Sequence, residues 1–268
     1  MSLGISTING ILMNKLKYLP IVVVVAVACL WLYLQHRPSP YHPRDYAEIA
    51  AEGVLRATME YNSLGMYADK DSVGGFYYKL LEAFARDHYL QVSITLEMSE
   101  EARMKGLTEG RFDLIASGMA TSSESLDTLL LTSPILLSRL VLVQRAPLTA
   151  DDSAKHIRSQ IDLAGKTIHI TKNPSIIQRL RHLSNEIGDT ILVQEETRYG
   201  NEQLLALVAH GDIDYTVCEE SLTRLFADSL PQLDTSIPIG FTQFYAWAVN
   251  KQSPVLLDSL NAWLKKRL

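Results

Sequence analysis

The chain has 268 residues, of which 47% are hydrophobic and 21% are charged, and this composition excludes extensive disorder beyond the N-terminus. A formal net charge of −5 at pH 7 argues against the clustered basic surface that nucleic-acid binding requires, so no nucleic acid is expected as a partner. The two cysteines, Cys29 and Cys218, are too few for a disulfide framework.

The N-terminal part contains an apolar run over residues 18–34. A run of about 17 residues is at the lower limit for crossing a bilayer. Lys15 and Lys17 precede it, which favours a cytoplasmic N-terminus over residues 1–17 and an exported C-terminal body. We therefore predict a membrane anchor or signal segment over residues 18–34. A cleaved signal peptide, or a lipoprotein signal at residues 26–29, remains an alternative, although the run stays apolar past that point.

Residues 35–48 are predicted to form a linker, because Pro38, Pro40 and Pro43 restrict the backbone and remove hydrogen-bond donors. The folded body is expected to begin near Ile49. From there, patterns typical of strands and of helices alternate along the chain. Such alternation predicts a mostly parallel sheet with helices on its faces.

The first elements of this body are a strand at residues 54–59, a helix at residues 75–88 and a strand at residues 92–96. The second strand is predicted because every second residue in it is apolar. The helix is predicted from its helical spacing of apolar residues. Its stripe consists of Phe76, Leu80 and Phe84.

An internal repeat relates residues 103–116 to residues 204–217. Each copy reads as a helix, a glycine that ends it (Gly110 or Gly211) and a strand that follows. Glycine suits that position because it adopts the left-handed conformation at no steric cost. Two such units about a hundred residues apart predict two similar lobes. The aspartates at the start of the two strands are Asp113 and Asp214.

The second half of the chain begins its regular structure with a strand at residues 167–170. A helix follows, with Asn173 as its N-cap and Pro174 at its first position. Residues 254–268 form the last predicted helix. Its apolar face, which we expect to pack in the core, consists of Leu256, Leu257, Leu260, Trp263 and Leu264.

Five segments carry a resemblance to a known family. They are residues 53–58, 74–76, 110–119, 162–167 and 211–217. In their order and spacing they resemble the family 3 extracellular solute-binding proteins over residues 50–268. Within that family, the patterns near the end of the chain look most like the N-terminal, non-catalytic domain of the membrane-bound lytic murein transglycosylase F group.

The resemblance implies an α/β fold of two lobes, the periplasmic-binding-protein-like fold of type II, preceded by the N-terminal transmembrane or signal segment. Residues 49–140 with 241–268 are assigned to the first lobe and residues 141–240 to the second. The chain would cross between the lobes near residues 138–144 and 240–248. A ligand would lie in the cleft between the lobes, which closes around it by a hinge motion.

The ligand-binding residues follow from aligning this sequence on the family pattern. They are Tyr61, Phe76, Ser117, Gly118, Met119, Thr121, Ser125, Ser175 and Glu219. Glu219 falls where family members place the carboxylate that meets the ligand's amino group. Ser125 falls where amino-acid-binding members place an arginine, so capture of a carboxylate would need another cation such as Arg139 or Lys172.

Catalytic and cofactor patterns are weak in this sequence. A lytic transglycosylase uses a glutamate followed by serine, and this dipeptide occurs at Glu124 and Glu220, but outside the helical, aromatic-rich context of such enzymes. The histidines have no metal-site spacing, and neither nucleotide-binding nor serine-hydrolase motifs occur. We therefore expect no cofactor, no metal and no enzymatic activity.

These features predict a membrane-tethered solute-binding or sensor domain with its soluble body in the periplasm. Its ligand would be a small polar molecule, either an amino-acid derivative or a cell-wall peptide (muropeptide). An ABC permease or a cell-wall enzyme is a possible protein partner. Two alternatives stay open, a regulatory domain of a transglycosylase F-like enzyme that lacks its catalytic domain, and a structural domain with a degenerate cleft.

Overall fold

A computed structural model describes residues 41–69, 72–121, 123–147, 153 and 155–268, together with Val25 and Val27. The chain divides into two units, residues 1–40 and 41–268, and the fold described below belongs to the second unit. The predicted anchor at residues 18–34, apart from those two valines, and the first part of the predicted linker, residues 35–40, lie outside the described residues. Among the residues that are described, no helix is both long and apolar enough to cross a membrane.

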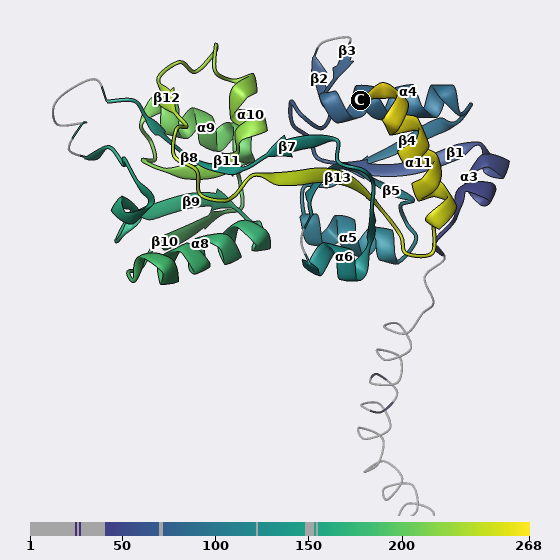
Figure 1. Ribbon diagram of the computed structural model, residues 1–268, viewed down its shortest axis with the longest axis horizontal. Coiled ribbons are helices and arrows are strands. Elements are labelled where there is room, and N and C mark those ends of the chain that lie inside the picture. The colour runs from purple at the N-terminus through teal and green to yellow at the C-terminus, as the bar shows by residue number, and fades with distance from the viewer. Residues whose placement is uncertain are drawn as a thin grey trace, which may run out of the picture. The chain divides into compact units, whose positions relative to one another are not determined.

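The first lobe is built on a mixed sheet with the strand order β4-β1-β5-β13-β6, and β7 also pairs with β13 (Figure 1). β1 runs parallel to β4 and β5, whereas β13 is antiparallel to its neighbours. The strands are β1 (Val54–Met59), β4 (Gln91–Leu96), β5 (Leu114–Ala120), β6 (Leu130–Leu131), β7 (Leu136–Ser138) and β13 (Gln243–Val249).

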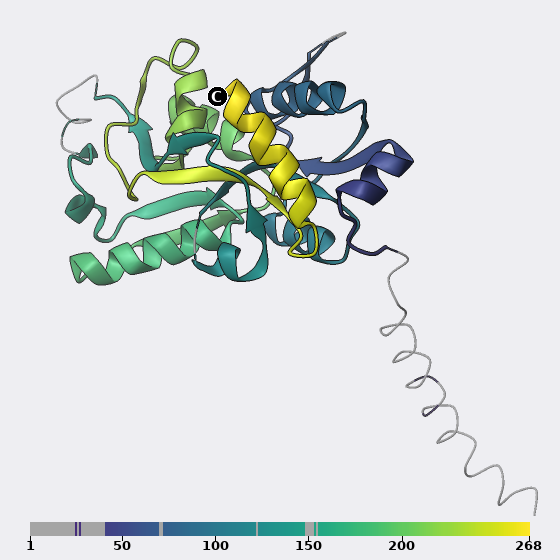
Figure 2. The ribbon, with the colours of Figure 1, turned by 45° about the vertical axis from the view of Figure 1, so that its right-hand side comes forward.

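Helices cover both faces of this first sheet (Figures 1 and 2). One core layer joins β1 to α3, α4 and α11, and a second joins β5 to α5. The helices of this lobe are α3 (Tyr46–Glu52), α4 (Phe76–Asp87), α5 (Glu100–Thr108), α6 (Ser123–Thr128) and α11 (Pro254–Arg267), and a hairpin of β2 (Tyr67–Asp69) and β3 (Ser72–Gly74) precedes α4.

The second lobe repeats this plan around a sheet with the strand order β10-β9-β11-β8-β12. One core layer packs under α8 and the other under α9. The strands are β8 (Leu140–Arg145), β9 (Thr167–Thr171), β10 (Leu192–Glu196), β11 (Thr216–Glu219) and β12 (Leu233–Asp234). The helices are η1 (Gln160–Leu163), α8 (Pro174–Ile187), α9 (Asn201–His210) and α10 (Glu220–Leu225).

The chain passes between the two sheets twice. It leaves the first sheet after β7 and enters the second at β8, and it returns between β12 and β13. The two strands that follow a crossing, β8 and β13, are antiparallel to the strands beside them. The expectation of a mostly parallel sheet is therefore wrong in this respect. Both sheets are mixed because each crossing reverses the direction in which the chain enters the next sheet.

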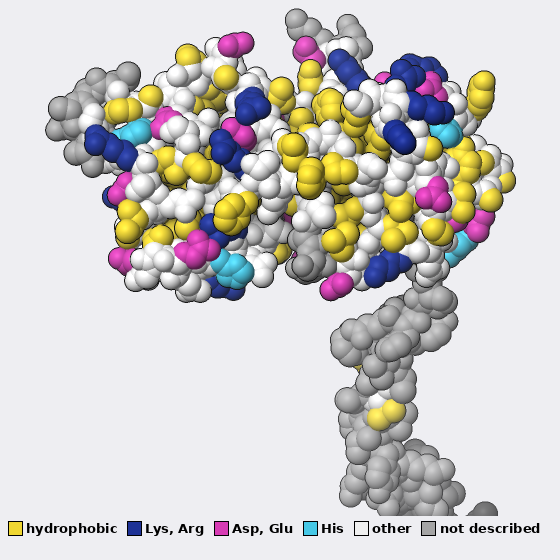
Figure 3. Space-filling view, viewed as in Figure 1, with side chains coloured by type: hydrophobic (Ala, Val, Ile, Leu, Met, Phe, Trp, Pro, Cys, Tyr) yellow, Lys and Arg dark blue, Asp and Glu magenta, His cyan; other side chains and the backbone are white. Residues whose placement is uncertain are grey.

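The crossing strands also expose apolar side chains. Leu137 on β7 lies opposite Phe244 on β13, and both are exposed, as is Phe241 just before β13. Hydrophobic side chains are visible in Figure 3 over this part of the molecule. Elsewhere on that face, side chains of both charge signs are interspersed. The surface in that view therefore has no single dominant charge.

The predicted repeat is confirmed at its two glycines. Gly110 follows α5 with φ +77° and Gly211 follows α9 with φ +90°, both in the left-handed region. A strand follows each, β5 and β11. The predicted N-cap is also confirmed, because the Asn173 side chain accepts hydrogen bonds from the first turn of α8.

The two aspartates of the repeat differ in their surroundings. Asp113 is buried and accepts hydrogen bonds from Arg44, at 3.0 Å from Nε, and from the backbone N–H of Arg56, at 2.8 Å. Asp214 is largely exposed and lies 3.3 Å from Arg145. Arg44 is itself buried, and α3 begins at Tyr46. Regular structure is thus present inside the range predicted as a linker, before Ile49.

The predicted apolar stripe of α4 is wrong at Phe76, whereas Phe84 is buried as predicted and Leu80 packs partly buried against the core. The buried side chains of this helix are Tyr77, Leu81, Phe84 and Ala85, whereas Phe76 is 42% exposed. A helix rich in apolar residues offers two overlapping stripes at helical spacing, and tertiary packing selects one of them. The helix begins at Phe76, and the core lies under the stripe that starts one residue later.

Candidate functional site

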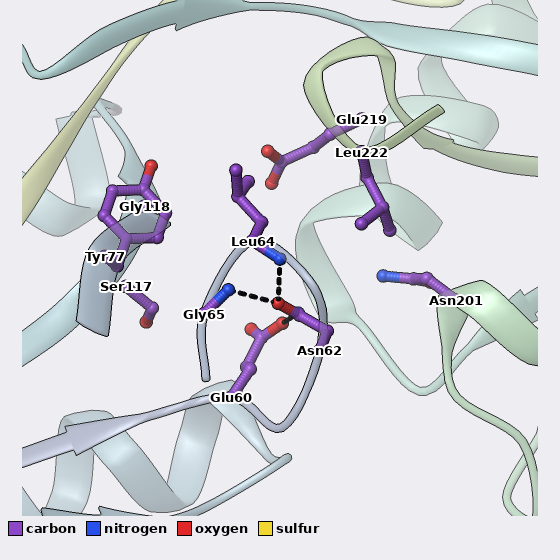
Figure 4. Close-up of a pocket in the computed structure, with 10 residues that line it drawn as sticks. All are labelled: Glu60, Asn62, Leu64, Gly65, Tyr77, Ser117, Gly118, Asn201, Glu219 and Leu222. Carbon is purple, nitrogen blue, oxygen red and sulfur yellow. Dashed lines mark hydrogen bonds between the residues drawn. The ribbon is translucent and has the colours of Figure 1, made fainter. Parts of the chain in front are cut away.

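A small cavity lies between the two lobes and holds about 30 Å³ of free space, which is room for about two water molecules. The first lobe contributes residues that follow β1, the start of α4 and the middle of β5. The second lobe contributes the end of β11 and the starts of α9 and α10. The lining consists of Glu60, Asn62, Leu64, Gly65, Tyr77, Ser117, Gly118, Asn201, Glu219 and Leu222 (Figure 4).

Two buried hydroxyl groups face this cavity from the first lobe. The Tyr77 hydroxyl and the Ser117 hydroxyl have no hydrogen-bond partner among the described residues. Burial raises the pKa of Tyr77, and the nearby charges of Glu219 and Glu60 raise it further, so its hydroxyl stays protonated and can donate. Gly118 allows this arrangement, because a Cβ there would lie 2.2 Å from the Tyr77 hydroxyl oxygen.

Glu219 supplies the acidic group of the second lobe. Burial raises the pKa of its carboxyl to about 8, and the charge of Glu60 contributes in the same direction. The Ser221 hydroxyl donates a hydrogen bond to Glu219 at 3.2 Å, which opposes the shift only in part. In this structure Glu219 is therefore mostly protonated at neutral pH. A cation placed beside it would favour the ionised form.

The second carboxylate of the cavity, Glu60, is already paired. Arg103 donates to it at 2.6 Å and also donates to the Glu97 carbonyl oxygen at 2.7 Å. Arg103 is 4% exposed. No arginine or lysine among the described residues lines the cavity. Arg103 thus already forms an ion pair with Glu60. Glu219 is the other carboxyl group of the lining, and it forms no ion pair with an arginine or lysine of the described residues.

Three of the predicted ligand-binding residues, Ser117, Gly118 and Glu219, line the cavity. Met119 is not among the residues that line it. Its side chain packs in the core layer under α5. The side chain of Ser125 lies outside the described part of the chain.

The remaining predicted positions are not among the residues that line this cavity, although Tyr61 and Phe76 adjoin residues that do. Tyr61 is 50% exposed, and Phe76 is on the exposed side of α4. Thr121 is exposed just after β5, and Ser175 is exposed in the first turn of α8. Arg139, one of the two suggested substitute cations, instead donates to Glu220 at 3.2 Å.

Seven lining residues were not predicted from the sequence. They are Glu60, Asn62, Leu64, Gly65, Tyr77, Asn201 and Leu222. The sequence did hold a signal for Glu60, because the residue directly after a strand lies at the sheet edge where clefts of α/β folds form. Tyr77 adjoins the predicted Phe76 and was missed through the register of α4.

Glu220 lies near the cavity but is unsuited to acid catalysis. Burial would raise the pKa of its carboxyl, but Arg139 and Arg224 outweigh that effect and lower it. A general acid needs the opposite shift, because it must hold a proton at working pH. The side chain of Glu124, the other candidate, lies outside the described part of the chain.

Direct hydrogen bonds also join the two lobes at the rim of the cavity. The backbone N–H of Ser63 donates to Glu202 at 2.6 Å, and the Asn173 side chain donates to Glu100 at 3.2 Å. Two α/β sheets joined by two crossings, with a polar cavity between them, define a mixed α/β binding fold of the type II periplasmic class.

The sequence itself then gives the family. Residues 55–267 match the bacterial extracellular solute-binding proteins, family 3, and the chain belongs to this family. Solved structures agree on the fold. The arginine-bound form of truncated ArgBP from T. maritima superimposes with a TM-score of 0.69 at 22% identity, covering 83% of this chain and 100% of that one. An ancestral arginine-binding protein bound to arginine gives 0.67 at 19% identity, covering 80% and 92%.

Curated relatives carry the name membrane-bound lytic murein transglycosylase F. The protein from Desulfosudis oleivorans is 27% identical over 242 residues, which cover 89% of this chain and 50% of the relative. The protein from Alteromonas mediterranea is 27% identical over 256 residues, which cover 94% and 52%. The chain therefore spans about half the length of these relatives.

Proposed function

We propose that the chain is a membrane-tethered, periplasmic solute-binding or sensor domain whose cleft binds a small polar ligand through an amine or guanidinium group. The observation that carries this proposal is the cavity between the lobes, where Glu219 has no basic partner. Tyr77 and Ser117, whose buried hydroxyls have no partner among the described residues, line the same cavity. Buried polar groups without partners are costly, so a ligand that supplies hydrogen bonds and positive charge would be stabilised there.

The same geometry argues against a carboxylate as the main recognition group. The lining contains two glutamates and no arginine or lysine among the described residues. Two of the structural neighbours, truncated ArgBP from T. maritima and an ancestral arginine-binding protein, are described as bound to arginine. The charge of an arginine-like or amine-bearing ligand therefore matches the polar groups of the site, whether the ligand is an amino-acid derivative or the free amine of a cell-wall peptide.

Isothermal titration calorimetry tests this proposal with two probes, L-arginine and agmatine, which is arginine without its carboxyl group. We expect both to bind, with affinities within about tenfold of each other, because the described lining of the cavity contains no lysine or arginine that would form an ion pair with the carboxylate of L-arginine. Glu219→Gln should abolish binding of both. Glu195→Gln, an exposed glutamate on β10, is the matched control and should bind like wild type. Loss of agmatine binding alone would contradict the recognition mode.

A second candidate is a regulatory domain of a cell-wall enzyme similar to transglycosylase F. The names of the curated relatives favour it, together with the fraction of their length that the chain covers. Reading the gene past the codon for Leu268 tests the fused form of this idea. An open frame that encodes a further domain supports it, and an immediate stop codon contradicts it. An ABC permease or a separate cell-wall enzyme would then be the partner to seek.

A third candidate, a structural domain with a degenerate cleft, is favoured by the small free volume of the cavity. It predicts that Glu219→Gln has no effect on any binding measurement and that no amine stabilises the folded protein. Thermal unfolding in the presence of L-arginine and agmatine separates this candidate from the first. A ligand that binds the folded state must raise the melting temperature.

A further inference from the structure

The cavity is small because a loop of the first lobe stands inside it. This loop, residues 60–66, connects β1 to the hairpin before α4 and closes on itself. The backbone N–H groups of Leu64 and Gly65 donate to the Asn62 side chain. The backbone N–H of Met66 donates to the Glu60 carbonyl oxygen at 3.1 Å, and the backbone N–H of Asn62 donates to the Met66 carbonyl oxygen at 3.1 Å. The loop is therefore internally bonded.

The same loop also occupies the N-terminus of α4. The N–H of Tyr77 donates to the Leu64 carbonyl oxygen at 3.0 Å, and the N–H of Tyr78 donates to that of Gly65 at 3.1 Å. The helix has no side-chain cap of its own. The N–H groups at a helix start are a ready site for an anion, but here backbone carbonyls use two of them.

Glycines permit this close packing of the loop. A Cβ at Gly65 would lie 2.3 Å from the Glu60 carbonyl oxygen. A Cβ at Gly75, whose φ is +123°, would lie 2.0 Å from the Gly65 carbonyl oxygen. A side chain at Gly65 would collide with the loop itself, and one at Gly75, just before α4, would push the loop away from that helix. The sequence is thus compatible with this specific loop position.

From that position the loop reaches the second lobe. The Leu64 side chain lies between Tyr77 and Leu222 and points toward the Glu219 carboxyl group (Figure 4). The neighbouring residue, Ser63, donates its N–H to Glu202 in the first turn of α9 at 2.6 Å. One loop therefore both fills the cavity and bonds to the opposite lobe.

We infer that the loop at residues 60–66 is a built-in occupant of the ligand cleft, with Leu64 as its plug and the Ser63–Glu202 hydrogen bond as its latch. The plug is apolar, whereas the cavity wall is polar. It leaves the Tyr77 and Ser117 hydroxyls without partners among the described residues. A polar ligand satisfies these groups better than leucine does, so it displaces Leu64. The size of the ligand is then set by how far this loop can move.

The latch is tested without any ligand, by measuring the distance between the lobes. Spin labels are attached to Tyr89→Cys in the first lobe and Ile161→Cys in the second, both exposed positions, in the full chain with Cys29→Ser. Pulsed electron resonance gives the distance distribution. We expect one short, narrow population in the otherwise wild-type protein and a longer, broader one in Glu202→Ala. Glu202→Gln keeps the acceptor oxygen and should restore the short distance.

Two outcomes overturn the latch. The unliganded wild type already shows the long, broad distribution, or Glu202→Ala keeps the short one. Glu195→Ala, an exposed glutamate of the same lobe, is the matched control and should match the wild type. This arm needs no ligand, so it stands even if the proposed amine specificity fails.

The plug is tested by calorimetry with agmatine as the probe, and this arm rests on the proposed function. Leu64→Ala should bind agmatine roughly tenfold more tightly, because less of the binding energy is used to displace the side chain. Circular dichroism verifies that the variant is folded. Equal or weaker binding by a folded Leu64→Ala protein would make Leu64 a ligand contact rather than a plug. If neither protein binds agmatine, the amine proposal fails and the distance measurement decides the inference.

Discussion

The repeat of helix, glycine and strand provides a matched pair of aspartates for a stability experiment. Asp113 is buried between two arginines, Arg44 and Arg56, and Arg44 is 5% exposed. Asp214 occupies the same position in the second lobe, but its side chain is 68% exposed and pairs with a partly exposed Arg145. The two carboxylates differ in burial at one structural position, so they separate the effect of burial from that of local geometry.

We predict that Asp113→Asn lowers the free energy of unfolding by about 3–5 kcal/mol, because it removes the buried carboxylate that two guanidinium groups share and leaves Arg44 with Glu52 as its remaining acidic partner. Asp214→Asn should cost about 0–1 kcal/mol, as expected for an exposed ion pair. Urea denaturation followed by tryptophan fluorescence measures both, since Trp247 is buried in the first lobe. Equal losses of unfolding free energy in the two variants would refute the argument that burial determines how much an ion pair contributes to stability.

Two further predictions concern the cavity. Agmatine affinity should rise by up to roughly tenfold per pH unit between pH 6 and about 8 and then level off, because the pKa of Glu219 is raised to about 8 and only its ionised form attracts the cation. The stability of the ligand-free protein should change in the opposite direction. It should fall as pH rises from 4.5 to about 8, because the folded state holds the Glu219 proton more tightly than the unfolded state does. Calorimetry measures the affinity trend over this range, and melting curves measure the stability trend. Gly118→Ala should cost about 1–3 kcal/mol of stability and weaken agmatine binding, because the new Cβ would collide with the Tyr77 hydroxyl. A melting curve unchanged from wild type would contradict this prediction.

Local signals predicted much of this fold. The caps at Asn173 and Gly211 and the final helix follow from rules that act within a few residues, and the structure has them where the sequence indicates. The repeat predicted two similar lobes, and each lobe has its own sheet. The family resemblance predicted that Glu219 and the Ser117–Gly118 pair face one cleft.

Other features depend on contacts between distant segments. The choice between the Phe76 and Tyr77 stripes of α4 is made by the sheet beneath the helix, which no local pattern records. The reversed strands β8 and β13 follow from the crossings between the lobes. The burial of Arg44 depends on Asp113, which is 69 residues away. The position of Leu64 likewise depends on α4 and on Glu202 in the other lobe.

A crystal structure of the protein purified from its native host tests the central claim most directly, because a tightly held ligand can remain in the cleft. The proposal predicts density for a small molecule with a nitrogen within hydrogen-bond distance of the Glu219 carboxyl, and Leu64 moved out of the cavity. A ligand bound elsewhere, or one that meets Glu219 through a carboxylate, would contradict it.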